Sequence, residues 1–117
     1  MDWKYLLTSY QGRINRAKFW AGIGAIFAGA IVAMIIDNVL GTSFDGMPYG
    51  FVYCIYILAA LYPIFSIYAK RWHDRDKSGW WSLIGLVPII GGVWLLVELG
   101  ILEGVRGPNR YGPDPLA

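Results

Sequence analysis

The chain has little charge, one cysteine and one histidine. Only 15% of its 117 residues are charged and 56% are hydrophobic, whereas a soluble domain has about 25% charged residues. A soluble fold would therefore have too little polar surface. Cys54 has no second cysteine with which to form a disulfide, and a lone histidine and a lone cysteine in different segments cannot assemble a zinc site. We predict no metal and no cofactor.

Familiar enzyme motifs are also missing. The sequence has no Walker loop, dinucleotide fingerprint, GxSxG elbow or HExxH pair. Its net charge is +2, and its ten lysines and arginines are divided among three short segments, so no long basic face exists for nucleic acid. These absences favour a protein that is not an enzyme and does not bind nucleic acid.

Three charge-free apolar runs dominate the chain, at residues 19–36, 50–69 and 79–97. An α-helix rises about 1.5 Å per residue, so about 20 residues cross a bilayer core of about 30 Å. The runs therefore predict an all-α membrane protein, a small bundle of three transmembrane helices preceded by a short interfacial amphipathic helix. The chain is expected to form one domain, 1–117, with spans at about 19–40, 50–69 and 79–102 and a polar tail at 104–117.

The third run is interrupted near its centre by Pro88, Gly91 and Gly92. Proline removes a helix hydrogen bond, so the run either kinks or breaks into a re-entrant hairpin. We expect one kinked span, because a hairpin needs shelter from surrounding protein that a small chain scarcely provides. Ser78 is expected to cap its start, and Glu98 to lie near the far interface.

A short amphipathic helix is predicted before the first run, from apolar residues at helical spacing: Trp3, Leu6, Leu7 and Tyr10. This helix either lies along the membrane interface or packs against the bundle. Gly12 suits its C-terminal cap, and Asn15 suits the N-terminal cap of the next helix.

Small residues recur every four positions within the first run, which lets another backbone approach closely. We favour packing against a helix of the same chain, with a second copy of the chain as the alternative. The predicted packing residues are Ala21, Ala25, Gly29 and Ala33.

Lysine and arginine are distributed unevenly between the segments that flank the runs. Four precede the first run, none lies in residues 37–49, four lie in residues 70–77, and two follow the third run. Because cytoplasmic loops carry the excess of these residues, we predict a cytoplasmic amino terminus. An unbroken third span places the tail outside, whereas a hairpin returns it and puts all ten basic residues on one side.

Residues 70–81 form the most concentrated polar segment, mixing both charge signs with aromatic residues. His73 and Asp74 are neighbours that point in different directions, so their adjacency does not make a catalytic pair. We favour a juxtamembrane loop that contacts anionic lipid headgroups, with a specific ligand or catalytic site as the alternative. The tail is rich in turn formers and is either disordered or docked through Arg110 and Tyr111.

Three ordered segments carry a resemblance to a known family. They read GRINRAKFW at residues 12–20, RWHDRDKSGWW at 71–81 and GPNRYGPDP at 107–115. Together they resemble the domain of unknown function 805 family, small proteins of the bacterial inner membrane. The family usually has Ser and Glu where this chain has Asn15 and Lys18; Asn15 keeps the cap, but Lys18 cannot return the capping-box bond. The resemblance implies a multi-pass protein of the bacterial inner (plasma) membrane and no established activity.

The leading functional hypothesis is a non-enzymatic integral membrane protein that acts through helix association or contact with anionic lipid. Its expected partners are membrane lipids, a second copy of the chain or another membrane protein. One alternative is a subunit of an oligomeric transporter or channel, and another is a lipid-modifying enzyme using Arg71, His73 and Asp74. The candidate functional or lipid-contact residues are Arg13, Arg16, Arg71, His73, Asp74, Arg75, Asn109, Arg110 and Tyr111.

Overall fold

The computed structural model describes residues 2–116 and is helical, as the three apolar runs predict. Within this range pairing of extended backbone is limited to two isolated β-bridges, Ser43 with Gly50 and Asn109 with Gly112. In chain order the helices are α1 (Trp3–Thr8), α2 (Arg16–Leu40), α3 (Phe51–Asp74), the 3₁₀ helix η1 (Gly79–Leu86), α4 (Ile90–Leu95) and the π-helix η2 (Leu96–Ile101).

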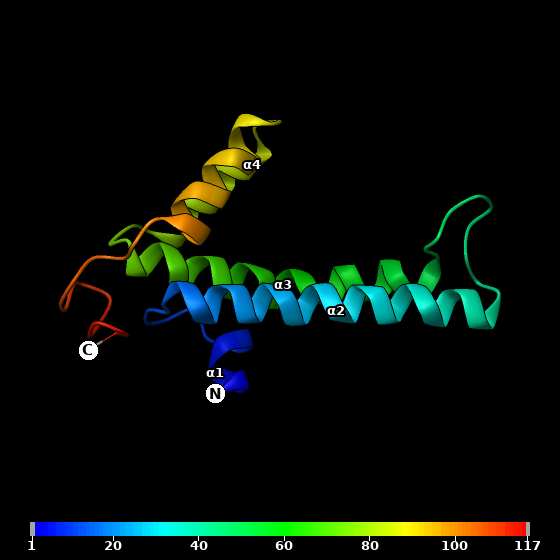
Figure 1. Cartoon of the computed structure of the whole chain (residues 1–117), viewed down its shortest axis with the longest axis horizontal. Helices are drawn as coiled ribbons and strands as arrows, with labels where there is room; N and C mark the ends of the chain where they lie inside the picture. Colours follow the sequence, from blue (N-terminus) through cyan, green and yellow to red (C-terminus); the bar gives the residue numbers. More distant parts are fainter. Residues whose placement is uncertain (1, 117) are drawn as a thin grey trace.

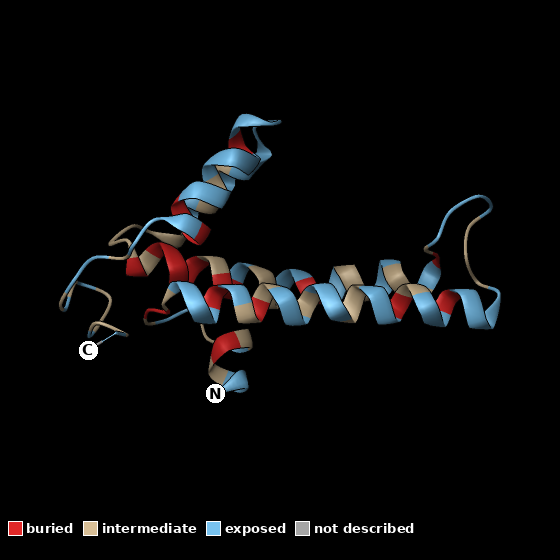
Figure 2. Cartoon of the chain, viewed as in Figure 1, coloured by how far each residue is buried: buried red, intermediate tan, exposed pale blue. Residues whose placement is uncertain are grey.

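The two long helices α2 and α3 form an antiparallel pair along the longest dimension of the molecule (Figure 1). Both are long and apolar enough to cross a membrane, since 24 residues rise about 36 Å. Much of their surface stays exposed (Figure 2), including Phe27, Ile55 and Leu58, which are 66%, 68% and 70% exposed. Cys54 is also exposed. The pair therefore presents an apolar exterior suited to lipid.

Small residues let α2 and α3 approach each other. A Cβ on Gly29 would lie 2.2 Å from the Tyr56 hydroxyl, which donates to the Ile26 carbonyl at 2.6 Å. Gly22, which lies outside the predicted stripe, is also closely packed, because a Cβ there would lie 2.7 Å from Ile67 Cδ1. Within the stripe Ala33 is buried, but Ala21 is only half-buried and Ala25 is exposed. The role of the stripe in association with other chains stays a prediction.

Asp37 ties the end of α2 to the start of α3. Its Oδ2 accepts from the backbone N–H groups of Gly50 and Tyr53 at 2.8 and 2.9 Å, and its Oδ1 accepts from Val52 N–H at 2.9 Å. These N–H groups have no partner within α3, because they belong to its N-cap and first turn. The N-cap residue Gly50 has no side chain, so Asp37 supplies the missing cap from the neighbouring helix.

The third apolar run is a hairpin, and the prediction of a single kinked span is wrong. Helix η1 forms one arm, α4 and η2 form the other, and the chain reverses at Pro88 and Ile89, whose φ is 67°. The arms touch where a Cβ on Gly91 would lie 1.9 Å from the Ile84 carbonyl oxygen. Proline ends the helix and glycine admits the second backbone. The hairpin projects away from α2 and α3 (Figure 1).

Helix α1 packs against the bundle through Leu6, which is 1% exposed, while Trp3 stays 45% exposed. Lys70 of α3 is fully buried and binds the last turn of α1. Its Nζ donates to the carbonyls of Tyr5 and Leu6 at 2.7 Å and of Ser9 at 2.6 Å. Of the two arrangements predicted for this helix, packing on the bundle is the one that the structure contains.

Two of the three predicted caps are confirmed. Asn15 accepts from Lys18 N–H at 2.9 Å, and Ser78 accepts from Trp80 N–H at 3.3 Å. The prediction for Gly12 is wrong, because α1 ends at Thr8 with Ser9 as its C-cap. Gly12 instead forms a turn with φ of 90° against the Tyr5 ring, where a side chain has no room.

Candidate functional site

Three polar segments far apart in the sequence meet at one end of the α2 and α3 pair. They are residues 12–16, 70–77 and 98–114, and we refer to them together as the polar cap. Both ends of the chain lie on this side, whereas the loop between α2 and α3 lies at the opposite end (Figure 1). The tail packs against residues 12–16 and 70–77, so it is docked and not disordered.

Asp74 is the centre of the polar cap. Its Oδ1 accepts from Arg13 Nε at 3.1 Å, and its Oδ2 accepts from Arg71 Nη1 at 2.6 Å. Arg13, Arg71 and Asp74 are 6%, 0% and 3% exposed. Buried charges require such pairing, because each loses its hydration. Arg13 and Arg71 are therefore enclosed by protein, and their predicted contact with lipid headgroups is corrected.

The same arginines bind the backbone of the tail. Arg71 Nε donates to the Leu99 carbonyl at 2.6 Å, and Arg71 Nη2 donates to the Leu102 carbonyl. Arg13 donates to the carbonyls of Val105 and Gly107 at 2.5 and 2.8 Å. Carbonyls at the end of a helix and in a loop need such donors. The guanidinium groups therefore fix the path of the chain as it leaves the hairpin.

Arg16 and Arg75 extend this set of contacts at the edge of the cap. Arg16 Nη1 donates to the Ile101 carbonyl at 2.8 Å, and Arg75 Nη1 donates to the Glu103 carbonyl at 2.6 Å. Gly104 passes so close to Asp74 that a Cβ would lie 2.0 Å from Oδ2. Only glycine fits this position without displacing the carboxylate.

His73 and Tyr111 join α3 to the tail. Their rings stack with centroids 3.9 Å apart and planes 5° apart. His73 Nδ1 lies 2.9 Å from the Gly12 carbonyl oxygen, and because a carbonyl accepts, Nδ1 carries the proton. Asn109 Nδ2 donates to the His73 carbonyl at 2.9 Å, and Arg110 Nε donates to Asp76 at 3.2 Å. His73 and Asp74 thus have separate partners, as their adjacency predicts.

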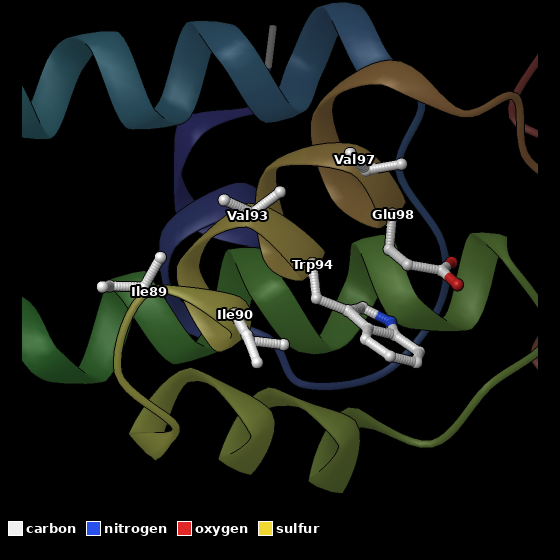
Figure 3. A pocket seen from close by; sticks show the side chains of 6 residues that line it. All are labelled: Ile89, Ile90, Val93, Trp94, Val97 and Glu98. Carbon is white, nitrogen blue, oxygen red and sulfur yellow. The ribbon is translucent and has the colours of Figure 1, made fainter.

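Glu98 lies at the base of the hairpin and not at a far interface, so that prediction is wrong. It is 8% exposed and accepts from Arg75 Nε at 3.0 Å and Lys77 Nζ at 2.8 Å. Glu98 also lines an open groove of ≈ 430 Å³, whose other lining residues are Ile89, Ile90, Val93, Trp94 and Val97. Figure 3 shows the side chains of these six residues. The second arm of the hairpin returns to the polar cap, where the first arm began. Glu98 therefore joins the base of the hairpin to the cap.

Sequence reasoning missed Lys70 and Asp37 as structural centres. The signal for Lys70 was Ser66, four residues earlier on the same helix face; Ser66 Oγ accepts from Lys70 Nζ at 2.8 Å. The signal for Asp37 was its position as a lone carboxylate directly after an apolar run. Such a residue needs a partner when it lies within an apolar helix.

Two membrane-capable helices, an apolar hairpin and a closed polar cap define a small all-helical protein of the membrane class. Its sequence matches the family described as "Protein of unknown function (DUF805)" over residues 7–113. The chain belongs to this family.

Three relatives match nearly the whole chain, and two of them are named inner membrane proteins. The chain is 34% identical to the inner membrane protein YhaH of Escherichia coli (strain K12) over 121 residues, which cover 98% of this chain and 97% of the relative. It is 40% identical to the inner membrane protein YhaI of the same strain, with 91% and 85% covered. It is 31% identical to the uncharacterized protein YiiR of that strain, with 92% and 86% covered. No solved structure matches.

Proposed function

We propose that the chain is a non-enzymatic integral protein of the bacterial inner membrane that contacts anionic lipid at the cytoplasmic face. Helices α2 and α3 cross the bilayer, the hairpin enters it from the cytoplasmic side without crossing, and the polar cap is cytoplasmic. The observation that carries this proposal is the position of the ten lysines and arginines. All belong to α1, the polar cap or the first residues of α2, whereas residues 37–49 at the opposite end have none.

The positive-inside rule converts this asymmetry into an orientation. Because a hairpin returns the chain, the tail lies on the same side as residues 12–16 and 70–77. The single-span arrangement would separate them. A cytoplasmic cap is therefore the arrangement that agrees both with the contacts between the segments and with the charge distribution.

Exposed basic side chains at this end supply the lipid contact. Arg16 and Lys18 lie on the first turn of α2 and are exposed, as is Lys4 on α1. Each basic residue near an anionic leaflet contributes about 1 kcal/mol of attraction. The buried arginines of the cap take no part in this contact, because their N–H groups donate to protein acceptors.

Labelling of single cysteines tests the orientation. In a Cys54→Ser background, Asp45→Cys marks the loop between α2 and α3, and Leu116→Cys marks the tail; both positions are exposed. We expect a membrane-impermeant maleimide to label position 45 in spheroplasts and to label position 116 only after permeabilisation. Labelling of position 116 in intact spheroplasts would contradict the proposal.

Lipid preference tests the contact itself. The protein reconstituted with matched acyl chains is expected to enrich phosphatidylglycerol over phosphatidylcholine in its first lipid shell, as measured with spin-labelled lipids. The double variant Arg16→Gln, Lys18→Gln is expected to lose most of this preference. A preference that is absent in the wild type, or unchanged in the variant, would exclude headgroup contact at these residues.

The alternatives find less support in the geometry. A lipid-modifying enzyme would need Arg71 as an anion clamp, but Arg71 is fully buried and donates to Leu99, Leu102 and Asp74. The transporter hypothesis depends on the break in the third run at Pro88, Gly91 and Gly92. In the structure this break is the turn of a hairpin whose arms pack on each other. The proline and the glycines are therefore explained by the turn and need no role in transport.

A further inference from the structure

The turn at the end of the hairpin leaves three backbone groups without hydrogen-bond partners. In a 3₁₀ helix such as η1, each carbonyl pairs with the N–H three residues later. For Gly85 that residue is Pro88, which has no N–H. Within residues 2–116 the carbonyls of Gly85 and Leu86 accept no hydrogen bond, and the N–H of Ile89 donates none. The turn therefore carries two free acceptors and one free donor.

The rest of the bundle leaves this turn uncovered. Leu86, Ile89 and Ile90 are 80%, 85% and 64% exposed. In the part of the chain that the structure describes, α4 packs only on η1 and η2. The hairpin points away from α2 and α3, so its tip lies far from both long helices (Figure 1). Partners for the three free backbone groups must therefore come from outside residues 2–116.

The proposed orientation places the turn in the hydrocarbon of the bilayer. Glu98 joins the base of the hairpin to the polar cap, and the returning arm, residues 90–101, rises about 18 Å. This length is less than the thickness of the bilayer core, which is about 30 Å, so the tip ends inside the core. Lipid chains offer no hydrogen bonds, and an unpaired backbone group in hydrocarbon is strongly destabilising. The three free groups therefore need partners from protein.

We infer that the tip of the hairpin binds the tip of a second copy of this chain. A twofold axis places the Ile89 N–H of each copy against the Gly85 or Leu86 carbonyl of the other, so the contact is self-complementary. A different membrane protein would need free backbone groups of its own at the same depth, which the bilayer disfavours. The second copy necessarily carries them. The inference rests on the proposed insertion of the hairpin, but not on lipid contact through Arg16 and Lys18.

Oxidative cross-linking tests the contact in vesicles of phosphatidylethanolamine and phosphatidylglycerol that contain no other protein. In a Cys54→Ser background, Ile89→Cys places a thiol beside the twofold axis, and we expect copper phenanthroline to convert most of the chain into a disulfide-linked dimer. The matched control is Ile55→Cys, because Ile55 is also exposed, at 68%, but lies on α3. It should form only collisional dimers, which disappear as lipid dilutes the protein. Equal yields at the two positions under high dilution would overturn the inference.

Energy transfer between dyes measures association without a label at the tip. The dyes are attached at Glu103→Cys, an exposed position at the base of the hairpin, and we expect transfer that persists on dilution with lipid. Leu86→Ala with Ile89→Gly removes apolar side chains from the tip and should lose most of the transfer. Ile55→Ala with Leu58→Ala removes exposed side chains from α3 and should keep it. Absent transfer with an unchanged tip, or equal transfer in the two double variants, would overturn the inference.

A folding defect does not account for the expected loss. Ile89 has φ of 67° and ψ of −64°, a conformation that is costly for a β-branched residue and accessible to glycine. Ile89→Gly alone should therefore unfold in detergent at the same temperature as the wild type or higher.

The labelling of position 116 separates this inference from the proposed function. A chain that stays monomeric while position 116 is protected in intact spheroplasts would keep the proposed orientation and overturn the inference. A dimer whose position 116 is labelled in intact spheroplasts would contradict the proposed orientation instead.

Discussion

The imidazole ring of His73 lies flat against the phenol ring of Tyr111, with centroids 3.9 Å apart and planes 5° apart. His73 lies in the last turn of the membrane-capable helix α3, and Tyr111 belongs to a tail with no regular secondary structure. Their stacking fixes a turn-rich segment that would otherwise lack a hydrophobic anchor.

Removing this stack should release the tail. Tyr111→Ala is expected to lose about 0.5–1.5 kcal/mol of docking free energy, the usual contribution of an aromatic pair. Limited trypsin cleavage at Arg110 should accelerate accordingly, whereas Tyr111→Phe keeps the ring and should be cleaved as the wild type is. Equal cleavage of the alanine variant and the wild type would mean that the stack contributes nothing to docking.

The ion pairs of the cap should differ sharply in strength. Arg13→Gln removes one partner of the buried Asp74, and we expect it to destabilise the protein by about 3–5 kcal/mol in thermal unfolding in detergent. Arg106→Gln breaks an exposed pair with Glu103 at 2.8 Å, and we expect little or no change in the unfolding temperature because water screens exposed charges. Similar losses in the two variants would contradict the central role of Asp74.

Adjacent glycines in the hairpin provide a matched pair of substitutions. Gly91→Ala places a Cβ 1.9 Å from the Ile84 carbonyl oxygen, whereas a Cβ on Gly92 meets nothing within 4 Å. We therefore expect Gly91→Ala to separate the arms and lower the unfolding temperature. Gly92→Ala should be neutral or stabilising by up to about 1 kcal/mol, because alanine favours helix. The reverse order of stabilities would refute the hairpin.

Acid should loosen the tail through Asp114. Backbone N–H groups of Leu116 and Gly107 donate to its carboxylate at 2.9 and 2.8 Å, and they hold the pKa of that carboxyl below its usual range. A lowered pKa means that the stabilisation is complete above about pH 4 and is lost as the pH falls through the folded-state value.

Hydrogen exchange of residues 105–116 at a series of pH values measures this effect. Protection should fall on acidification in the wild type and should lose that dependence in Asp114→Asn. An unchanged pH profile in the variant would assign the effect to another carboxyl group.

Periodicity and composition predicted the helices better than their connections. The long apolar runs predicted α2 and α3, because the length and hydropathy of a run can be read from contiguous residues alone. Pro88, Gly91 and Gly92 indicate a break in the third run, but they do not distinguish a kink from a hairpin, because the contact between Gly91 and Ile84 forms only after the chain reverses. Asn15 and Ser78 were recognised because capping acts within three residues.

The polar cap was less accessible to sequence reasoning. The sequence indicates Arg13, Arg71 and Asp74 as candidates, but it does not predict their burial, because that depends on contacts with residues 98–114 of the returning chain. A juxtamembrane arginine that faces lipid and one that faces a backbone carbonyl look alike in a sequence. Lys70 was missed for the same reason, because its carbonyl partners in α1 come from a distant part of the chain.

The arginines of the cap hold the departing chain by its carbonyl oxygens, and every residue type carries a carbonyl. Substitution of the exposed side chains of Ile101, Leu102 and Val105 should therefore leave this attachment intact, provided that the backbone keeps its path. A particular residue type is required instead at the arginines that donate, and at Gly104, which passes close beside Asp74. The residues whose carbonyls are bound should therefore tolerate many substitutions. The arginines that donate to those carbonyls, and Gly104, should tolerate few.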